Sequence, residues 1–224
     1  MIQFSQGNFL FELWMSRAAL LDALSVTCSV ALGGIAIGLV VGLFAALAAV
    51  FGPAWLRWSV GIFVYAARGV PALVTIFFVY YGVGVIWRAL PAQSAGTLAL
   101  GLYAAAQMTE IFRGALQSLP RGQIEAAKAI GLTFWLRIVD VVAPLSVRRA
   151  LPSLVNTAVD LVKASTLVSA LGAGDLLLTG QQIAARTFLI PEVYLTLWIF
   201  YLSINTTLTV LGRWLEDRFR NVIY

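Results

Sequence analysis

The most constraining feature of this sequence is a long stretch without charge: from Ala23 to Leu56 no residue is acidic or basic. About 20 apolar residues suffice for a helix to cross the hydrocarbon core of a bilayer, so this stretch predicts a membrane-spanning helix. The whole chain has a similar character, because 61% of its 224 residues are hydrophobic and only 11% are charged. A soluble domain carries roughly 25% charged residues. The sequence therefore predicts an all-α, polytopic membrane protein without a separate soluble domain.

Apolar stretches further along the chain bring the expected number of transmembrane helices to five, all within one domain over residues 1–224. The expected spans are residues 18–50, 55–87, 94–113, 149–171 and 191–213. Gly34, Gly38 and Gly42 stand four residues apart in the first span, which predicts a smooth stripe for close helix packing. The sequence RGVP at residues 68–71 predicts a bend in the second span, since proline removes a backbone donor.

Two further segments flank these spans. Residues 1–17 lack the basic start and the small-residue cleavage site of a signal peptide. Their aromatic side chains predict a segment at the membrane interface instead; they are Phe4, Phe9, Phe11 and Trp14. Residues 172–186 form a looser linker with room for a short surface or re-entrant helix.

The basic residues predict the orientation of the chain. With five spans, ten of the 15 lysines and arginines fall on one side of the membrane. These are Arg57, Arg113, Arg121, Lys128, Arg137, Arg148, Arg149, Arg213, Arg218 and Arg220. Only Arg17, Arg88 and Arg186 fall on the other side. Because the positive side is cytoplasmic, we expect the N-terminus outside, the C-terminus in the cytoplasm, and residues 114–148 as a cytoplasmic loop.

The composition argues against several kinds of chemistry in this chain. It contains no histidine, which is the commonest general base and metal ligand. Neither lysine ends a glycine-rich phosphate-binding stretch, so we expect neither nucleotide binding nor ATP hydrolysis in the chain. The single cysteine, Cys28, supports neither a disulfide nor a metal site. The sequence thus predicts no catalytic residues and no metal, and its one-sided charge indicates membrane orientation rather than nucleic-acid binding.

The loop between the third and fourth predicted spans contains an alanine-rich segment with the sequence EAAKAIG at residues 125–131. Pro120 favours a helix that begins near Arg121 or Gln123. Glu125 would then lie in the first turn, where the helix dipole favours a carboxylate. Alanines at 126, 127 and 129 give this helix little side-chain bulk, and Gly131 ends it. Apolar residues from Leu132 to Val142 continue at helical spacing, as in an interfacial helix.

This spacing resembles the cytoplasmic loop of permease subunits in bacterial ATP-binding cassette importers. The resemblance implies a coupling helix over residues 121–131 that sits in a cleft of the ATPase subunit. The implied coupling residues are Gly122, Glu125, Ala126, Ala127 and Gly131. The sequence departs from the family pattern at Ala143, where a bulky aliphatic residue usually precedes the proline.

Other elements between residues 65 and 170 are similar to permeases for polar amino acids. The RGVP sequence at 68–71 resembles their Arg-Gly-Thr/Ser-Pro element, and EIFRG at 110–114 resembles their Glu-Ile-x-Arg-Gly run. Pro152, Asn156 and the sequence KASTL at 163–167 resemble their fourth helix. Gln107 replaces a usual tyrosine and Ala164 a usual acid, which leaves the identity of the substrate open.

Polar residues inside the predicted spans are candidates for a transport pathway. Asp160 lies twelve residues past Arg148, about 18 Å along a helix, near the middle of a core of about 30 Å. An ionisable group at that depth is costly, which makes it a functional-site candidate. Asp160 either binds substrate or forms an ion pair with Lys163 on the same helical face.

The remaining polar residues have two interpretations each. Arg68 either neutralises a substrate carboxylate or caps the backbone at the bend. Gln107 and Asn156 either line the pathway or form hydrogen bonds between helices. Glu110 and Arg113 are expected to form a structural ion pair. The candidate pathway residues are therefore Arg68, Gln107, Asn156, Asp160 and Lys163.

The resemblance implies a permease subunit of a polar amino-acid importer in the bacterial inner membrane. Its implied partners are a second permease subunit, an ATPase dimer that carries ATP and magnesium, an external substrate-binding protein, and membrane lipid. Two alternatives differ in function: an ion-coupled secondary transporter that works without an ATPase, and an importer subunit for a non-amino-acid amine or opine. The absence of internal repeats disfavours the first of these.

Overall fold

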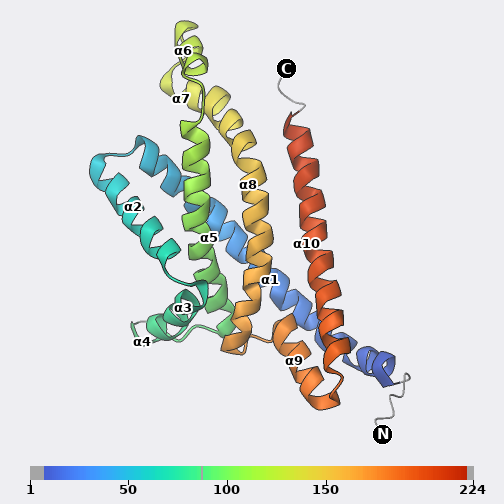
Figure 1. The fold of residues 1–224 in the computed structure, drawn as a ribbon. Helices are drawn as coiled ribbons and strands as arrows, with labels where there is room; N and C mark the ends of the chain where they lie inside the picture. The colour runs from blue at the N-terminus through green and yellow to red at the C-terminus, as the bar shows by residue number, and fades with distance from the viewer. Residues whose placement is uncertain (1–7, 87, 221–224) are drawn as a thin grey trace. The chain divides into compact units, whose positions relative to one another are not determined.

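The computed structural model describes residues 8–86 and 88–220, and within them every regular element is a helix. Figure 1 shows the helices in chain order, from blue α1 to red α10. Their bounds are α1 Asn8–Phe51, α2 Ala54–Gly69, α3 Ala72–Phe77, η1 Phe78–Gly82, α4 Val83–Ile86, α5 Ala92–Gln117, α6 Arg121–Ala129, α7 Phe134–Leu136, η2 Arg137–Val142, α8 Ala143–Ala164, η3 Ser165–Leu171, α9 Leu176–Thr187 and α10 Ile190–Arg220. The predicted all-α class is confirmed.

Among the described residues, three helical stretches are long and apolar enough to cross a membrane: Phe11–Phe51, Phe134–Leu171 and Ile190–Phe219. A fourth span results if the broken pair Ala54–Gly69 and Ala72–Ile86 is counted as one. These four correspond to the first, fourth, fifth and second predicted spans. The third expected span, residues 94–113, corresponds to α5, whose 26 residues extend about 39 Å but which is not apolar enough to be counted among these stretches.

The modest hydropathy of α5 follows from its packing. Ala104, Ala105, Ala106, Met108 and Thr109 all have 0% exposure. A helix that is covered by protein rather than lipid does not need large apolar side chains on every face. Small residues instead let neighbouring backbones approach, and the threonine hydroxyl is satisfied by the carbonyl of Ala105 at 2.6 Å.

The predicted bend falls where the RGVP sequence placed it. Helix α2 ends at Gly69, and Val70 is extended, with φ −102° and ψ 135°. The ring of Pro71 disfavours helical geometry at the preceding residue, so the chain leaves α2 before it starts α3 at Ala72. Arg68 lies in the last turn of α2.

The N-terminal aromatic residues do not form a separate segment. Helix α1 already includes Phe9, Phe11 and Trp14 and continues without interruption to Phe51; Phe4 lies outside the described residues. The linker after the fourth span contains a short helix, as expected, because α9 occupies Leu176–Thr187.

The contacts of the chain group into two units. The first comprises Met1–Gly34, Ala72–Leu100 and Leu161–Thr206, and the second comprises Ile35–Pro71, Gly101–Asp160 and Thr207–Tyr224. The apolar core of the first unit joins α1, α9 and α10. Its buried residues are Leu20, Ala23, Leu176, Ile183, Ala184, Val193 and Leu197.

In the second unit, the glycine stripe of α1 packs against α5. A Cβ atom at Gly38 would lie 2.7 Å from the Cβ of Ala104, and one at Gly42 would lie 2.8 Å from the Cβ of Met108. Both distances are shorter than van der Waals contact, so only glycine fits. The predicted role of Gly38 and Gly42 in close packing is confirmed.

A single helical run from α7 to α8 continues past Pro144. The run includes the π-helical segment η2, in which the N–H of Ala143 donates to the carbonyl of Ile138, five residues back. Proline has no N–H and its ring collides with a carbonyl four residues earlier in an α-helix. A π-helical turn before Pro144 widens the helix there, which accommodates the ring. The apolar residues of 132–142 are thus largely helical, as their spacing predicted.

Candidate functional site

The alanine-rich segment forms the short helix α6. Pro120 is extended, with φ −60° and ψ 128°, and its carbonyl accepts a hydrogen bond from the N–H of Gln123 at 3.1 Å. The helix therefore begins at Arg121. Glu125 lies in the second turn rather than the first, so the expectation that it interacts with the N-terminal dipole is wrong. The dipole effect fades beyond the first turn.

The C-terminus of α6 is closed by two backbone hydrogen bonds. The N–H of Gly131 donates to the carbonyl of Lys128 at 2.9 Å, and that of Leu132 donates to the carbonyl of Ala127 at 3.1 Å. This pair of bonds defines a Schellman motif, which requires a left-handed residue between them. Gly131 has φ +82°, a conformation that glycine adopts without strain. Gly131 thus ends the helix, as predicted.

The helix presents most of its surface outward. Gly122, Glu125, Ala126 and Gly131 are all exposed, and the side chain of Ile130 is 77% exposed. Ala127 differs, because it is only 4% exposed. It lies on the face of α6 that packs within the chain; α6 is in contact with η2. Of the five predicted coupling residues, Ala127 therefore supports the loop from within, and its side chain is not accessible to a partner.

A contact that the sequence did not reveal ties the two ends of this loop together. Arg149, near the start of α8, donates through Nη1 to the main-chain carbonyl of Ser118 and to its Oγ at 3.0 Å. Ser118 directly follows α5. The two partners are 31 positions apart in the sequence, and the residues between them include α6, α7 and η2. This Arg149–Ser118 clamp joins α5 to α8 at the base of the loop.

The predicted ion pair on α5 is present. Arg113 donates through Nε to Oε1 of Glu110 at 3.0 Å, and through Nη1 to Oε1 of Gln117 at 2.9 Å. Glu110 also lines a cavity of about 450 Å³ together with Arg68, Tyr65, Gly61, Val64 and Gly69. The structure thus brings Arg68 and the Glu110 carboxylate to one cavity, whereas Gln107, one turn away on α5, is half-buried and is not among its lining residues.

The other three candidate pathway residues lie on α8. Asn156, Asp160 and Lys163 follow one another at intervals of four and three residues, which places them on one face of the helix. All three are described as follows: Asp160 and Lys163 are exposed and Asn156 is half-buried, although they lie in Phe134–Leu171, a helical stretch long and apolar enough to cross a membrane. An exposed polar face on a membrane-spanning helix is costly in contact with lipid. It therefore suits a water-filled path better than a surface that faces lipid.

A buried acid, Asp175, was missed in the sequence. It is the N-cap of α9, and its carboxylate accepts hydrogen bonds from the N–H groups of Leu177 at 3.3 Å and Leu178 at 3.4 Å. Thr27 of α1 accepts a third from the N–H of Leu176 at 3.0 Å. The only signal was an acid directly before an apolar run, which is typical of a helix N-cap.

These features define a polytopic helical membrane protein with an exposed, small-residue helix outside its spans and a polar face within one of them. The family model of the binding-protein-dependent transport system inner membrane component matches residues 38–221. The chain belongs to this family, and it is therefore a membrane component of a transport system.

Individual relatives are similar over most of their length. The probable amino-acid ABC transporter permease protein YckA of Bacillus subtilis (strain 168) is 34% identical over 186 residues, which are 83% of this chain and 82% of that protein. The glutamine transport system permease protein GlnP of Escherichia coli (strain K12) is 32% identical over 93% of this chain and 96% of its own. A crystal structure of an amino acid ABC transporter with histidines has a TM-score of 0.84 at 27% identity and covers 93% of this chain and 97% of its own.

Proposed function

We propose that this chain is the membrane-spanning subunit of an ATP-driven importer for a polar amino acid, and that α6 couples it to a separate ATPase. The observation that carries the proposal is the exposed surface of α6, to which Glu125 and the small side chain of Ala126 both contribute. The family and its amino-acid permeases support the same function.

Two observations support a polar amino acid as the cargo. They are the polar residues on one face of α8 and the names of the relatives. A carboxylate at Asp160 suits the ammonium group that every amino acid carries, and Lys163 suits a carboxylate. Low dielectric in the membrane strengthens both interactions. Because the α-amino and α-carboxyl groups are common to all amino acids, these residues select the class and not the side chain. An opine would share the same groups, so a binding assay on the cognate external binding protein separates the two cargoes.

The transport cycle requires partners. Five spans per subunit, with the N-terminus outside and α6 in the cytoplasm of a bacterial inner membrane, would let two permease subunits enclose a path around a two-fold axis. ATP and magnesium would bind in the ATPase dimer, whose closure moves α6. Through the Arg149–Ser118 clamp and the Schellman turn, α6 passes that movement to α5 and α8, which opens the path outward.

The test uses the exposed alanine, because Ala127→Trp would disrupt the packing of the chain itself. We expect Ala126→Trp to overpack the interface with the ATPase at a cost of about 1–3 kcal/mol. That cost corresponds to a roughly 5- to 150-fold weaker association, measured by co-purification of the ATPase with the membrane-inserted permease.

Gln123→Trp is a matched control, since residue 123 is exposed on the same helix but is not among the five coupling residues. Normal substrate-stimulated ATP hydrolysis by the Ala126→Trp complex would remove the coupling role of α6. Full uptake by the permease in the absence of any ATPase would instead establish an ion-coupled carrier.

A further inference from the structure

One face of α2 carries a row of exposed apolar side chains. Trp55, Trp58, Ile62 and Tyr65 follow at intervals of three and four residues, which places them on one side of the helix. Trp58 is 74% exposed and Tyr65 84% exposed. A Cβ atom at Gly61 would meet no atom within 4 Å, so the row has a hollow at its centre.

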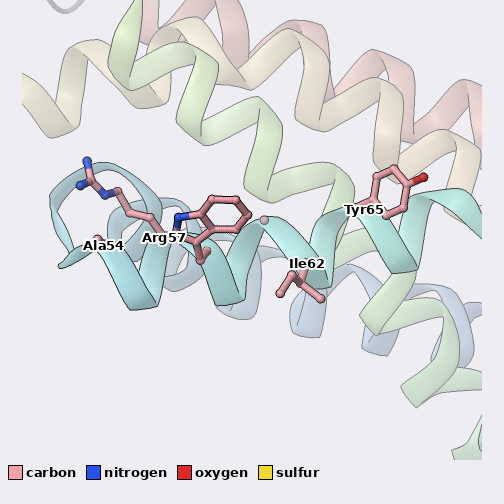
Figure 2. A pocket seen from close by; sticks show the side chains of 6 residues that line it. Ala54, Arg57, Ile62 and Tyr65 are labelled. Carbon is pink, nitrogen blue, oxygen red and sulfur yellow. The ribbon is translucent and has the colours of Figure 1, made fainter.

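This hollow is part of a cavity of about 510 Å³ lined by Ala54, Arg57, Trp58, Gly61, Ile62 and Tyr65. Figure 2 shows Arg57 and Tyr65 at opposite ends of the site. Their separation of eight positions in the sequence corresponds to about 12 Å along the helix axis. That length is slightly less than one leaflet, which is half of a hydrocarbon core of about 30 Å.

The lining has a polarity that suits an amphiphile. Among the described residues that line it, the only charged one is Arg57, at one end, and apolar or aromatic side chains make up most of the rest. In the part of the chain that the structure describes, no hydrogen bond or ion pair holds the Arg57 guanidinium. The ligand that fits therefore has one anionic group and a hydrocarbon chain.

The predicted orientation places the Arg57 end at the cytoplasmic leaflet. That leaflet carries anionic lipids, which attract lysine and arginine near its surface. Trp55 and Trp58 flank Arg57, and tryptophan is enriched at this level of the bilayer. A protein partner would have to bring its own acidic group to Arg57, because the lining offers none and burial of an unpaired charge is costly.

We propose that this cavity is a binding site for one anionic phospholipid of the cytoplasmic leaflet. Arg57 binds the phosphate, and one acyl chain lies along Trp58 and Ile62 in the hollow at Gly61. This site selects a lipid with a negative headgroup, whereas the surrounding bilayer lipid contacts the protein without such selection.

The test measures lipid retention by native mass spectrometry on the intact transporter complex, exchanged into nanodiscs of phosphatidylglycerol or phosphatidylcholine. We expect selective retention of phosphatidylglycerol, about fivefold weaker in Arg57→Gln, as expected for one basic residue near an anionic surface. Arg213→Gln, which removes an exposed arginine on the same predicted side, is the control and leaves retention unchanged. Gly61→Leu fills the hollow and lowers retention without a change of charge.

Several outcomes would overturn the proposal. One is equal retention of both lipids by the unaltered protein, and another is an equal loss in Arg57→Gln and Arg213→Gln. A third is displacement of the lipid by millimolar inorganic phosphate, which would indicate a site for a free anion. A disulfide between two copies of a Gly61→Cys, Cys28→Ser variant would place protein rather than lipid at the cavity and would likewise exclude the site.

Discussion

At the scale of single residues, Asp175 combines two influences that act on its ionisation in opposite directions. Its side chain is 1% exposed, and this burial raises the pKa of the Asp175 carboxyl above the ordinary aspartate value. The N–H groups of Leu177 and Leu178 favour the charged form and lower the pKa, but by less. Because the native state then holds a proton more tightly than the unfolded state, the contribution of Asp175 to stability decreases as pH rises through the native pKa.

Substitutions of Asp175 distinguish the effect of burial from the effect of the hydrogen bonds at the N-cap. Asparagine keeps an oxygen for the N-cap and removes the charge, so we expect Asp175→Asn to gain stability relative to the unaltered protein as pH rises from about 4 to 7. Asp175→Ala loses the cap and is expected to be about 1 kcal/mol less stable at pH 7. Thermal unfolding in detergent, followed at a series of pH values, measures both. A pH-independent difference in stability between the Asp175→Asn variant and the unaltered protein would contradict the burial of a charge.

Substitutions also distinguish the two possible roles of Asp160, which are substrate binding and neutralisation of Lys163. If Asp160 binds the substrate ammonium, Asp160→Asn leaves expression intact and lowers uptake about tenfold or more, the value of one charged hydrogen bond. If its main role is to neutralise Lys163, the same change lowers the amount of folded protein, and Asp160→Asn with Lys163→Gln restores it. Uptake and yield of the single and double variants measure this; full uptake by Asp160→Asn would exclude both roles.

At the scale of elements, the Arg149–Ser118 clamp is a structural link between the loop and the spans. Removal of such a hydrogen-bonded contact costs about 0.5–1.5 kcal/mol, so we expect Arg149→Ala to reduce the amount of substrate transported per ATP hydrolysed by about two- to tenfold. Ser118→Ala removes only the hydroxyl acceptor and leaves the carbonyl, which predicts a smaller effect. Arg149→Lys retains one donor and should recover part of the loss.

Uptake and ATP hydrolysis, measured together in proteoliposomes, give this ratio directly. If Arg149→Ala lowers both rates in proportion, the clamp stabilises the fold without a part in coupling. Wild-type coupling in all three variants would show that the loop transmits movement by another route.

The sequence predicts an element well where its limits depend on local chemistry. Pro120 and Gly131 set the ends of α6, Pro71 sets the break after α2, and the spacing of Gly38 and Gly42 identifies a packing face. The Glu110–Arg113 pair is also local, since its members lie one turn apart.

Features that depend on contacts between distant residues could not be predicted in this way. The burial of Ala127 depends on how the rest of the chain packs against α6, and the clamp joins residues separated by 31 positions. The sequence predicts α5 as a span, but it does not reveal the neighbours that cover this helix and explain its low hydropathy. Glu125 lies in the second turn because α6 begins at Arg121; a start at Gln123, two residues later, would place it in the first.

At the scale of the whole molecule, orientation in the membrane is the property on which the proposed coupling depends. We expect a cysteine at Gln123, on α6, to react with membrane-impermeant thiol reagents only from the cytoplasmic side. A cysteine at Ser94, near the start of α5, should react only from outside. Both positions are exposed, and a Cys28→Ser background removes the native thiol. Labelling with the opposite sidedness would invert the predicted topology and exclude contact between α6 and a cytoplasmic ATPase.

Helix α1 has a consequence for the bilayer itself. Its 44 residues extend about 66 Å, roughly twice the thickness of a hydrocarbon core of about 30 Å. A helix of this length either runs obliquely through the core or leaves part of its length outside it. An oblique helix adapts to a thicker or thinner membrane by a small change in tilt, at a cost of fractions of a kcal/mol per Å. We therefore expect the protein to tolerate lipids of different acyl-chain length, with the adjustment made by reorientation of α1 rather than by distortion of its backbone.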